Sequence, residues 1–227
     1  MCLLGSRSRI MVVGVKSGYS PNTTLTSARQ SNSLRPTRRD SMTVRQKWSG
    51  AGTRWREQLT QDFARNPFWE SRATLGVWRL GQAVHRRPGL AATLLRRLHT
   101  VCDAVWVRGL IGAELPREID CGAGLRLPHG GRGVILHPDT RIGAGVTLYH
   151  RVTVGVSGPG RPPVIEDGAY VGAGATIIGP VVVGPGAKIG AGAVVVDDVP
   201  GGATAVGVPA VVRRRTVVLD AEGVNSV

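Results

Sequence analysis

Two histidines, His129 and His150, are the residues of this chain whose type and placement could best support catalysis. A neutral imidazole can accept the proton of an alcohol while the alcohol oxygen attacks an acyl carbon. No Ser or Cys stands in a nucleophile motif, so such a transfer would need no covalent enzyme intermediate. The two side chains can cooperate only if the surrounding elements bring them together.

Those elements follow a repeat of six residues. Each repeat begins with an aliphatic residue or Cys, and glycine often follows, as in IGAGVT, VGAGAT and VGPGAK. The thirteen positions, with three extra residues after Leu127 and five after Val154, are Leu115, Cys121, Leu127, Leu136, Ile142, Leu148, Val154, Ile165, Val171, Ile177, Val183, Ile189 and Val195. This period predicts a mainly β fold, a parallel β-helix with three short strands and three glycine-rich corners in each coil.

The same register places the histidines on one corner of the predicted prism. His129 and His150 stand two residues after the start of their repeats, and Ala173 and Ala191 hold the same place in the next two coils. Successive coils stack about 4.8 Å apart, so the four residues form a column. The alanine methyls would leave backbone N–H and C=O groups accessible to an extended, amide-bearing chain such as pantetheine. On any β-helix, a corner histidine is often only a solvent-facing polar residue.

Before the repeats, the apolar pattern is helical, with a break at Asn66-Pro67 and further helices over about 70–85 and about 90–110. Arginines interrupt the last of these, which argues against a membrane span and indicates a packed or interfacial helix. We expect four regions: a disordered basic extension (1–49), a helical segment (50–113), the β-helix domain (114–212) and a C-terminal tail (213–227).

The N-terminal extension has a distinct composition. Residues 1–49 carry nine Lys and Arg and one acid, with no sustained period, which indicates disorder. The Arg- and Ser-rich composition also fits an organellar transit peptide. A natural start near Met42 is the other interpretation.

Charge and cysteine content limit the partners and the compartment. The formal net charge of +14 suggests nucleic-acid binding, but no zinc-finger spacing, RNA-binding aromatic motif or basic-helix pattern accompanies it, so we predict no nucleic-acid partner. Cys2, Cys102 and Cys121 form no CxxC motif and no disulfide framework, which predicts a reduced, cytoplasmic protein. Cys121 falls on an inward repeat position, as expected of a small buried apolar residue rather than a nucleophile.

Four stretches of the repeat region are typical of a known family: GLRLPHG (124–130), VTVG (152–155), VGAGATIIGPVVVGPGAKIGAGAVVVDDVP (171–200) and AVGVPA (205–210). With them the chain resembles the catalytic part of bacterial serine O-acetyltransferases and their relatives that acetylate sugars of surface polysaccharides. The resemblance implies a left-handed β-helix, acetyl-CoA as co-substrate, no metal, a small hydroxyl-bearing acceptor, and active sites between the subunits of a homotrimer.

The resemblance also implies roles for individual residues. The histidine of the HG element, here His129, acts as general base, and an acidic residue fifteen positions earlier, here Glu114, orients it or binds substrate. The backbone around Gly172, Ala173 and Ala191 binds the coenzyme. The two alanines are also those that the corner column indicates.

Three cations complete the expected site. Lys188 and Arg213, near the end of the β-helix, are expected to bind coenzyme phosphates. A desolvated serine carboxylate would need a charged partner. Arg132, Arg151 and Arg161 are nearby in sequence, and Arg161, in the loop after the VTVG element, is the one we expect to bind it. A solvated terminal run is the other interpretation of Arg213 and its neighbours.

Three positions depart from the family pattern. Pro128 replaces the Asp that commonly precedes the histidine, and Pro162 stands where the family has a second active-site histidine. His150 is an additional histidine at a site usually occupied by Gln, and we predict a catalytic role for it. The GLRLPHG element, the upstream acid and the preceding helical segment make L-serine, acetylated for cysteine biosynthesis, the first expected acceptor. A sugar of a surface polysaccharide or its precursor is the alternative, and it would tolerate the two prolines better.

Two further classes of function stay open at this point. Some β-helices of this kind hold zinc between subunits through three histidines, and His129, His137 and His150 are available here. The short H-x4-H spacing is not present, and His137 begins a different face. A non-catalytic scaffold is the other class, which a failure to bind acetyl-CoA would favour.

Overall fold

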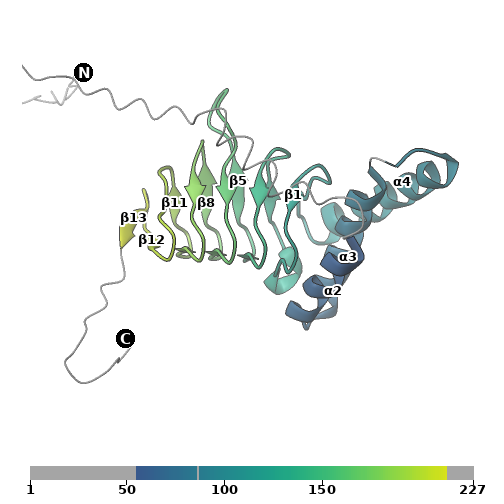
Figure 1. The fold of residues 1–227 in the computed structure, drawn as a ribbon, viewed down its shortest axis with the longest axis horizontal. Helices are drawn as coiled ribbons and strands as arrows, with labels where there is room; N and C mark the ends of the chain where they lie inside the picture. The colour runs from purple at the N-terminus through teal and green to yellow at the C-terminus, as the bar shows by residue number, and fades with distance from the viewer. Residues whose placement is uncertain (1–54, 86, 214–227) are drawn as a thin grey trace, which may run out of the picture.

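The computed structural model describes residues 55–85 and 87–213 of the 227-residue chain. The predicted disordered extension over 1–49 and the tail beyond residue 213 lie outside the described residues. Within them, a helical part precedes a long β-helix (Figure 1).

The helical part has four elements, namely α2 (Trp55–Arg65), α3 (Trp69–His85), α4 (Leu90–Cys102) and the π-helix η1 (Asp103–Leu110). Pro67 disfavours helical geometry at the residue before it, so α2 ends ahead of this point. Gly89 leads into α4 with φ 106°, a conformation that glycine adopts without steric cost. The predicted helical segment is confirmed. Among these described helices, none is long and apolar enough to cross a membrane.

Thirteen short strands follow, and they are β1 (Asp120–Cys121), β2 (Ile135–Leu136), β3 (Arg141–Ile142), β4 (Thr147–Leu148), β5 (Thr153–Gly155), β6 (Val164–Ile165), β7 (Tyr170–Val171), β8 (Thr176–Ile178), β9 (Val182–Val183), β10 (Lys188–Ile189), β11 (Val194–Val195), β12 (Thr204–Val206) and β13 (Val211–Arg213). They form sheet A (β2, β5, β8, β11), sheet B (β1, β3, β6, β9) and sheet C (β4, β7, β10, β12, β13). All pairs are parallel except β12 with β13.

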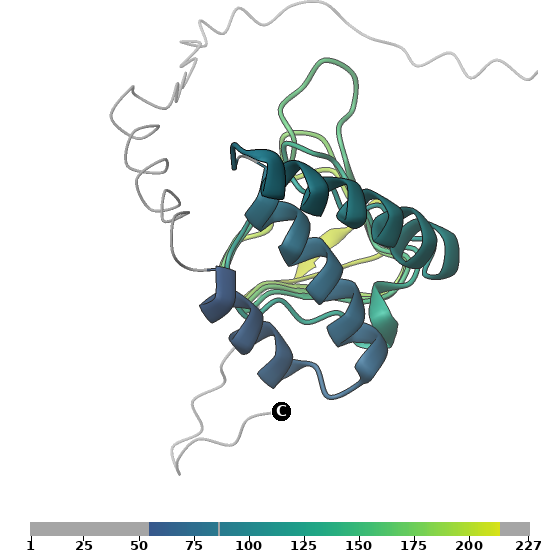
Figure 2. The same cartoon turned by 90° about the vertical axis from the view of Figure 1, so that its right-hand side faces the viewer.

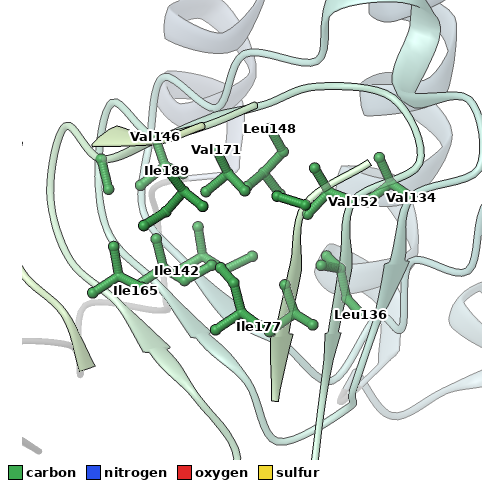
Figure 3. Packing of buried hydrophobic residues seen from close by; sticks show 14 of the residues in the cluster. Val134, Leu136, Ile142, Val146, Leu148, Val152, Ile165, Val171, Ile177 and Ile189 are labelled. Atoms are coloured by element: carbon green, nitrogen blue, oxygen red, sulfur yellow. The ribbon is translucent and has the colours of Figure 1, made fainter. Parts of the chain in front are cut away.

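Because the chain passes from sheet to sheet in turn, it winds around a three-sided prism, and the predicted parallel β-helix is confirmed. The thirteen aliphatic and Cys positions of the repeat are all buried inside it. Figure 3 shows part of this packing, with Leu148, Val171 and Ile189 among the labelled residues. Leu148, Val171 and Ile189 are register partners and therefore lie one above another. Burial raises the pKa of Cys121 to about 11, so this thiol stays protonated near neutral pH, as expected of a packing residue.

The helices close one open end of the β-helix (Figure 2). Backbone groups of the first coil have no neighbouring coil on that side, and polar side chains of the helical part bind them instead. Asp62 accepts a hydrogen bond from the Leu125 N–H at 2.8 Å, and Asn66 accepts one from the Leu127 N–H at 2.9 Å. The Asn66 amide also donates to the Leu125 carbonyl at 2.8 Å. The side chains thus take the place of a further coil.

Arg79 of α3 lies at the centre of this cap and is fully buried. Its Nε donates to Asp62 Oδ2 at 2.8 Å. Its two terminal nitrogens donate to the carbonyl oxygens of Cys121 at 3.1 Å and Gly122 at 2.6 Å. The guanidinium is therefore both neutralised and hydrogen-bonded, which a buried charge requires.

His99 of α4 should make the protein less stable in acid. Its buried ring lies against Gly81, where a methyl group would overlap it, and neither ring nitrogen has a hydrogen-bond partner in the described chain. Burial lowers the pKa of His99 below its usual value of 6.5. The unfolded chain then binds the proton more tightly than the folded chain, so stability falls as the pH decreases below about 6.5.

We expect His99→Phe to reduce this fall in the free energy of unfolding, measured by urea titration between about pH 5 and pH 7. Thr100→Ala, at the next, exposed position, is the control and should retain the full dependence. An unchanged slope in His99→Phe would show that another group is responsible.

Candidate active site

His129 lies in the short helical turn η2 (Pro128–Gly131), where extra residues expand the corner between sheets C and A. Its backbone has φ 59° and ψ 33°, in the left-handed region that residues other than glycine rarely adopt. Ser71 of α3 holds the turn: its hydroxyl donates to the Leu127 carbonyl at 2.8 Å and accepts from the Gly130 N–H at 3.3 Å. The helical cap thus fixes the turn that exposes the imidazole.

His150 lies on the same corner, one coil further along. In the next two coils this corner reads Gly-Ala-Gly (172–174 and 190–192), whereas here it reads Tyr-His-Arg (149–151). Arg151 therefore stands at a position that glycine holds in the next two coils, and its φ is 58°. Within residues 55–85 and 87–213, His129 is the other residue besides glycine that has a positive φ. Each such residue costs about 1–3 kcal/mol of strain, which is typical of functional sites.

The structure brings the two predicted histidines together. The ring centroids of His129 and His150 are 5.1 Å apart, and the rings meet edge to face at 83°. Tyr149 lies beside them, with its ring 6.2 Å from that of His129. The Nδ1 atom of His150 is buried and has no hydrogen-bond partner within the described chain. Buried unpaired nitrogens are uncommon in proteins, and this one belongs to a ring that meets the His129 ring.

Sequence reasoning missed Tyr149 and Tyr170. Tyr170 lies on β7 of sheet C, and its ring centroid is 5.2 Å from that of Tyr149. A hydrogen bond with Tyr149 raises the pKa of Tyr170, so this phenol stays protonated. A signal was available, because Tyr149 stands where the equivalent corners have Gly172 and Gly190.

Ala173 and Ala191 continue the corner beyond His150. Backbone hydrogen bonds of 2.9 and 2.8 Å join the successive coils at this corner. Ala173 is half-buried and Ala191 is exposed. Gly172 is buried, and a methyl group there would lie 2.7 Å from the Ala191 nitrogen, so packing between coils requires glycine at this position. Ala173 and Ala191 thus continue the corner column from His150. In the first coil Arg132 holds this backbone place, because its carbonyl accepts a hydrogen bond from the Arg151 N–H at 2.8 Å, and His129 reaches the same corner from the inserted turn η2 instead.

Lys188 and Arg213 lie on the outer face of sheet C. Lys188 pairs with Thr204 on one side and with Tyr170 on the other, and Arg213 pairs with Thr204 from β13. Both cations are exposed. This face therefore offers two positive charges, close in the sheet, to phosphate groups of a ligand.

Other predicted residues lie apart from the histidine pair within one chain. Glu114 is exposed beside Ile135 on sheet A, and in the described chain no hydrogen bond or ion pair joins it to His129. Arg161 is exposed in the loop between β5 and β6, at the corner between sheets A and B. His137 follows β2 at that same corner. Among the described residues, no three His, Cys, Asp or Glu side chains group closely enough to hold a metal ion.

Comparisons with known proteins agree with this architecture. The bacterial transferase hexapeptide family (six repeats) matches residues 162–197. A serine acetyltransferase of Helicobacter pylori is 38% identical over 138 residues, which are 59% of this chain and 75% of the relative. The crystal structure of Neisseria gonorrhoeae serine acetyltransferase is 28% identical, with a TM-score of 0.60 over 78% of this chain and 71% of that one. Its complex with serine matches at 29% identity and a TM-score of 0.57, over 76% and 74%.

Proposed function

The chain belongs to the serine acetyltransferase family, and on this premise we propose that it transfers the acetyl group of acetyl-CoA to the hydroxyl of L-serine. The observation that carries the proposal is one corner at which two imidazoles, His129 and His150, meet, and along which Ala173 and Ala191 follow His150 in the next two coils. The complex of the gonococcal relative with serine supports this acceptor. The product, O-acetyl-L-serine, would serve cysteine biosynthesis.

His129 acts as the general base in this proposal. Its imidazole accepts the proton of the serine hydroxyl as that oxygen attacks the thioester carbonyl, and the imidazolium then returns the proton to the departing CoA sulfur. The edge of the His150 ring restricts the orientation of the His129 ring. Backbone N–H groups of the glycine-rich corner stabilise the oxyanion. Glu114 binds the serine ammonium or orients His129, and Arg161 binds the serine carboxylate.

Acetyl-CoA lies along the alanine column, with its phosphates toward Lys188 and Arg213. Ala191→Leu should then raise the KM for acetyl-CoA about tenfold, since a displaced contact of about 1.4 kcal/mol corresponds to that factor. The KM for serine should change less than about twofold. Both values come from steady-state kinetics.

Ala144→Leu is the matched control for this substitution. Ala144 is also an exposed corner alanine within an IGAG sequence, but it lies between sheets B and C. Its replacement should leave both KM values unchanged. Equal effects of the two substitutions would show that the coenzyme does not follow the column.

A sugar hydroxyl is the second candidate acceptor, and the Tyr149–Tyr170 pair favours it. Two aromatic rings 5.2 Å apart, of which Tyr149 lies beside His129, offer apolar faces against which a sugar ring can pack. Pro128 and Pro162 also remove two polar groups that a charged amino acid would use.

Parallel assays of acetyl-CoA consumption distinguish the acceptors. L-Serine is tested against nucleotide-linked and lipid-linked sugars with the same preparation of the full chain. Saturable CoA release with serine supports the proposal. Release with a sugar and none with millimolar serine would replace serine by the sugar.

We further propose that the enzyme is a cytoplasmic homotrimer. Ala191 is exposed at a corner of the prism, and a neighbouring copy packed there would close the coenzyme site. Cys102 and Cys121 are free thiols, which is consistent with a reducing compartment. Light scattering at micromolar concentration should give three times the mass of the chain. A monomer mass would contradict a site shared between copies.

A further inference from the structure

One face of α4 and η1 is apolar and exposed along its length. Five aliphatic residues recur on it at spacings of three and four, and we call them the apolar stripe: Leu90, Leu94, Leu98, Val101 and Val105, with exposed fractions of 91, 70, 54, 60 and 60%. The opposite side of α4, with Ala92 and His99, is buried. Figure 1 shows α4 at the end of the molecule farthest from the last coils. A continuous exposed apolar face of this kind indicates a docking surface.

The positive charge of the chain is concentrated in the same part of the sequence. Nineteen of the 29 Lys and Arg residues precede Glu114, against five of the 15 Asp and Glu residues. The whole net charge of +14 therefore precedes Glu114, and the part from Glu114 onward is neutral. Arg87 and Arg97 are exposed next to the stripe. Arg97 follows Leu94 by three residues and precedes Val101 by four, so it lies beside both on the helix surface.

We propose that the apolar stripe docks the chain onto an anionic phospholipid surface. In this arrangement α4 lies in the membrane interface, with its aliphatic side chains among the acyl chains and its arginines at the lipid phosphates. Cationic residues beside a wide apolar helix face are typical of interfacial helices, and anionic lipids attract them further.

Two other occupants fit the observations less well. A second copy would bring a region with the same positive charge against the stripe, and like charges oppose such pairing. A nucleic acid would match the charge, but its affinity comes from neutralised phosphates and makes no use of five exposed aliphatic side chains. The docking surface involves only the helical part, so it does not depend on the proposed acetyl transfer.

Co-sedimentation of the full chain with lipid vesicles tests the proposal. The vesicles contain phosphatidylcholine alone, or phosphatidylcholine and phosphatidylglycerol at about two to one. The unmodified chain should bind the mixed vesicles and bind the neutral ones weakly. Leu94→Ser combined with Leu98→Ser keeps the charge and should lower the partition coefficient on mixed vesicles at least about tenfold. Val196→Ser, at a valine of the β-helix that is 48% exposed, is the matched control and should bind normally.

Arg87→Gln combined with Arg97→Gln separates the two attractions. This variant should bind mixed vesicles about tenfold less tightly and neutral vesicles unchanged. All substituted residues are exposed, so each variant should retain the circular dichroism of the unmodified chain. Absence of binding to mixed vesicles, or normal binding by the Leu94/Leu98 variant, would overturn the proposal. A lower assembly mass of that variant in light scattering would also overturn it, because the stripe would then join copies of the chain.

Discussion

His129→Ala should lower kcat/KM for acetyl transfer by about 10²–10⁴-fold, because it removes the proposed general base. The side chain is exposed and lies outside the core, so the variant should unfold at the same urea concentration as the unmodified protein. His129→Asn provides a stricter version of this experiment. Asn tolerates the left-handed backbone of this position, with φ 59°, and cannot act as a base. Both variants should be inactive to a similar degree.

The neighbouring ring provides the comparison for this prediction. His150→Ala should reduce kcat/KM by a smaller factor, since it removes a side chain that positions His129 and leaves the base in place. Steady-state kinetics of the three variants at one pH give the order. A larger loss in His150→Ala than in His129→Ala would assign the base to His150.

Asp62→Ala should destabilise the protein by about 3–5 kcal/mol, because it leaves the buried Arg79 guanidinium without its counter-ion. The same change removes the acceptor of the Leu125 N–H, at 2.8 Å from Asp62 Oδ1. Urea unfolding at a fixed protein concentration measures the loss, since association would make stability depend on concentration.

Asp103→Ala is the matched control for the cap. Asp103 pairs with Arg108 at 2.9 Å, but the Arg108 side chain is 68% exposed. An exposed ion pair contributes little, so this variant should lose less than about 1 kcal/mol. Similar losses in the two variants would mean that the Asp62–Arg79 pair does not close the β-helix.

The β-helix could be predicted from the sequence because its signal is periodic and local. Thirteen inward positions repeat every six residues apart from two insertions, and each insertion appears as an expanded corner. Given this register, the column of His150, Ala173 and Ala191 follows from counting. The place of His129 does not, because the three inserted residues put Arg132 at the equivalent backbone position. The helices were equally visible, since Pro67 interrupts a strong apolar pattern.

The helical cap and the tyrosines could not be read in the same way. Asp62 and Arg79 are seventeen residues apart, and their partners Cys121 and Leu125 are more distant still. No periodic pattern links a buried charge on a helix to backbone groups of a distant coil. The ring contact between Tyr149 and Tyr170 likewise depends on the stacking of coils. The partner of Glu114 also stays a prediction, because its carboxylate makes no hydrogen bond to His129 within the described chain.

Incubation of the full chain with L-serine and acetyl-CoA labelled in its acetyl group tests the central claim most directly. We predict that the label moves to the serine oxygen, with one CoA released for each O-acetyl-L-serine formed, and that His129→Asn abolishes the transfer. Binding of acetyl-CoA without labelled O-acetyl-L-serine at millimolar serine would contradict the account.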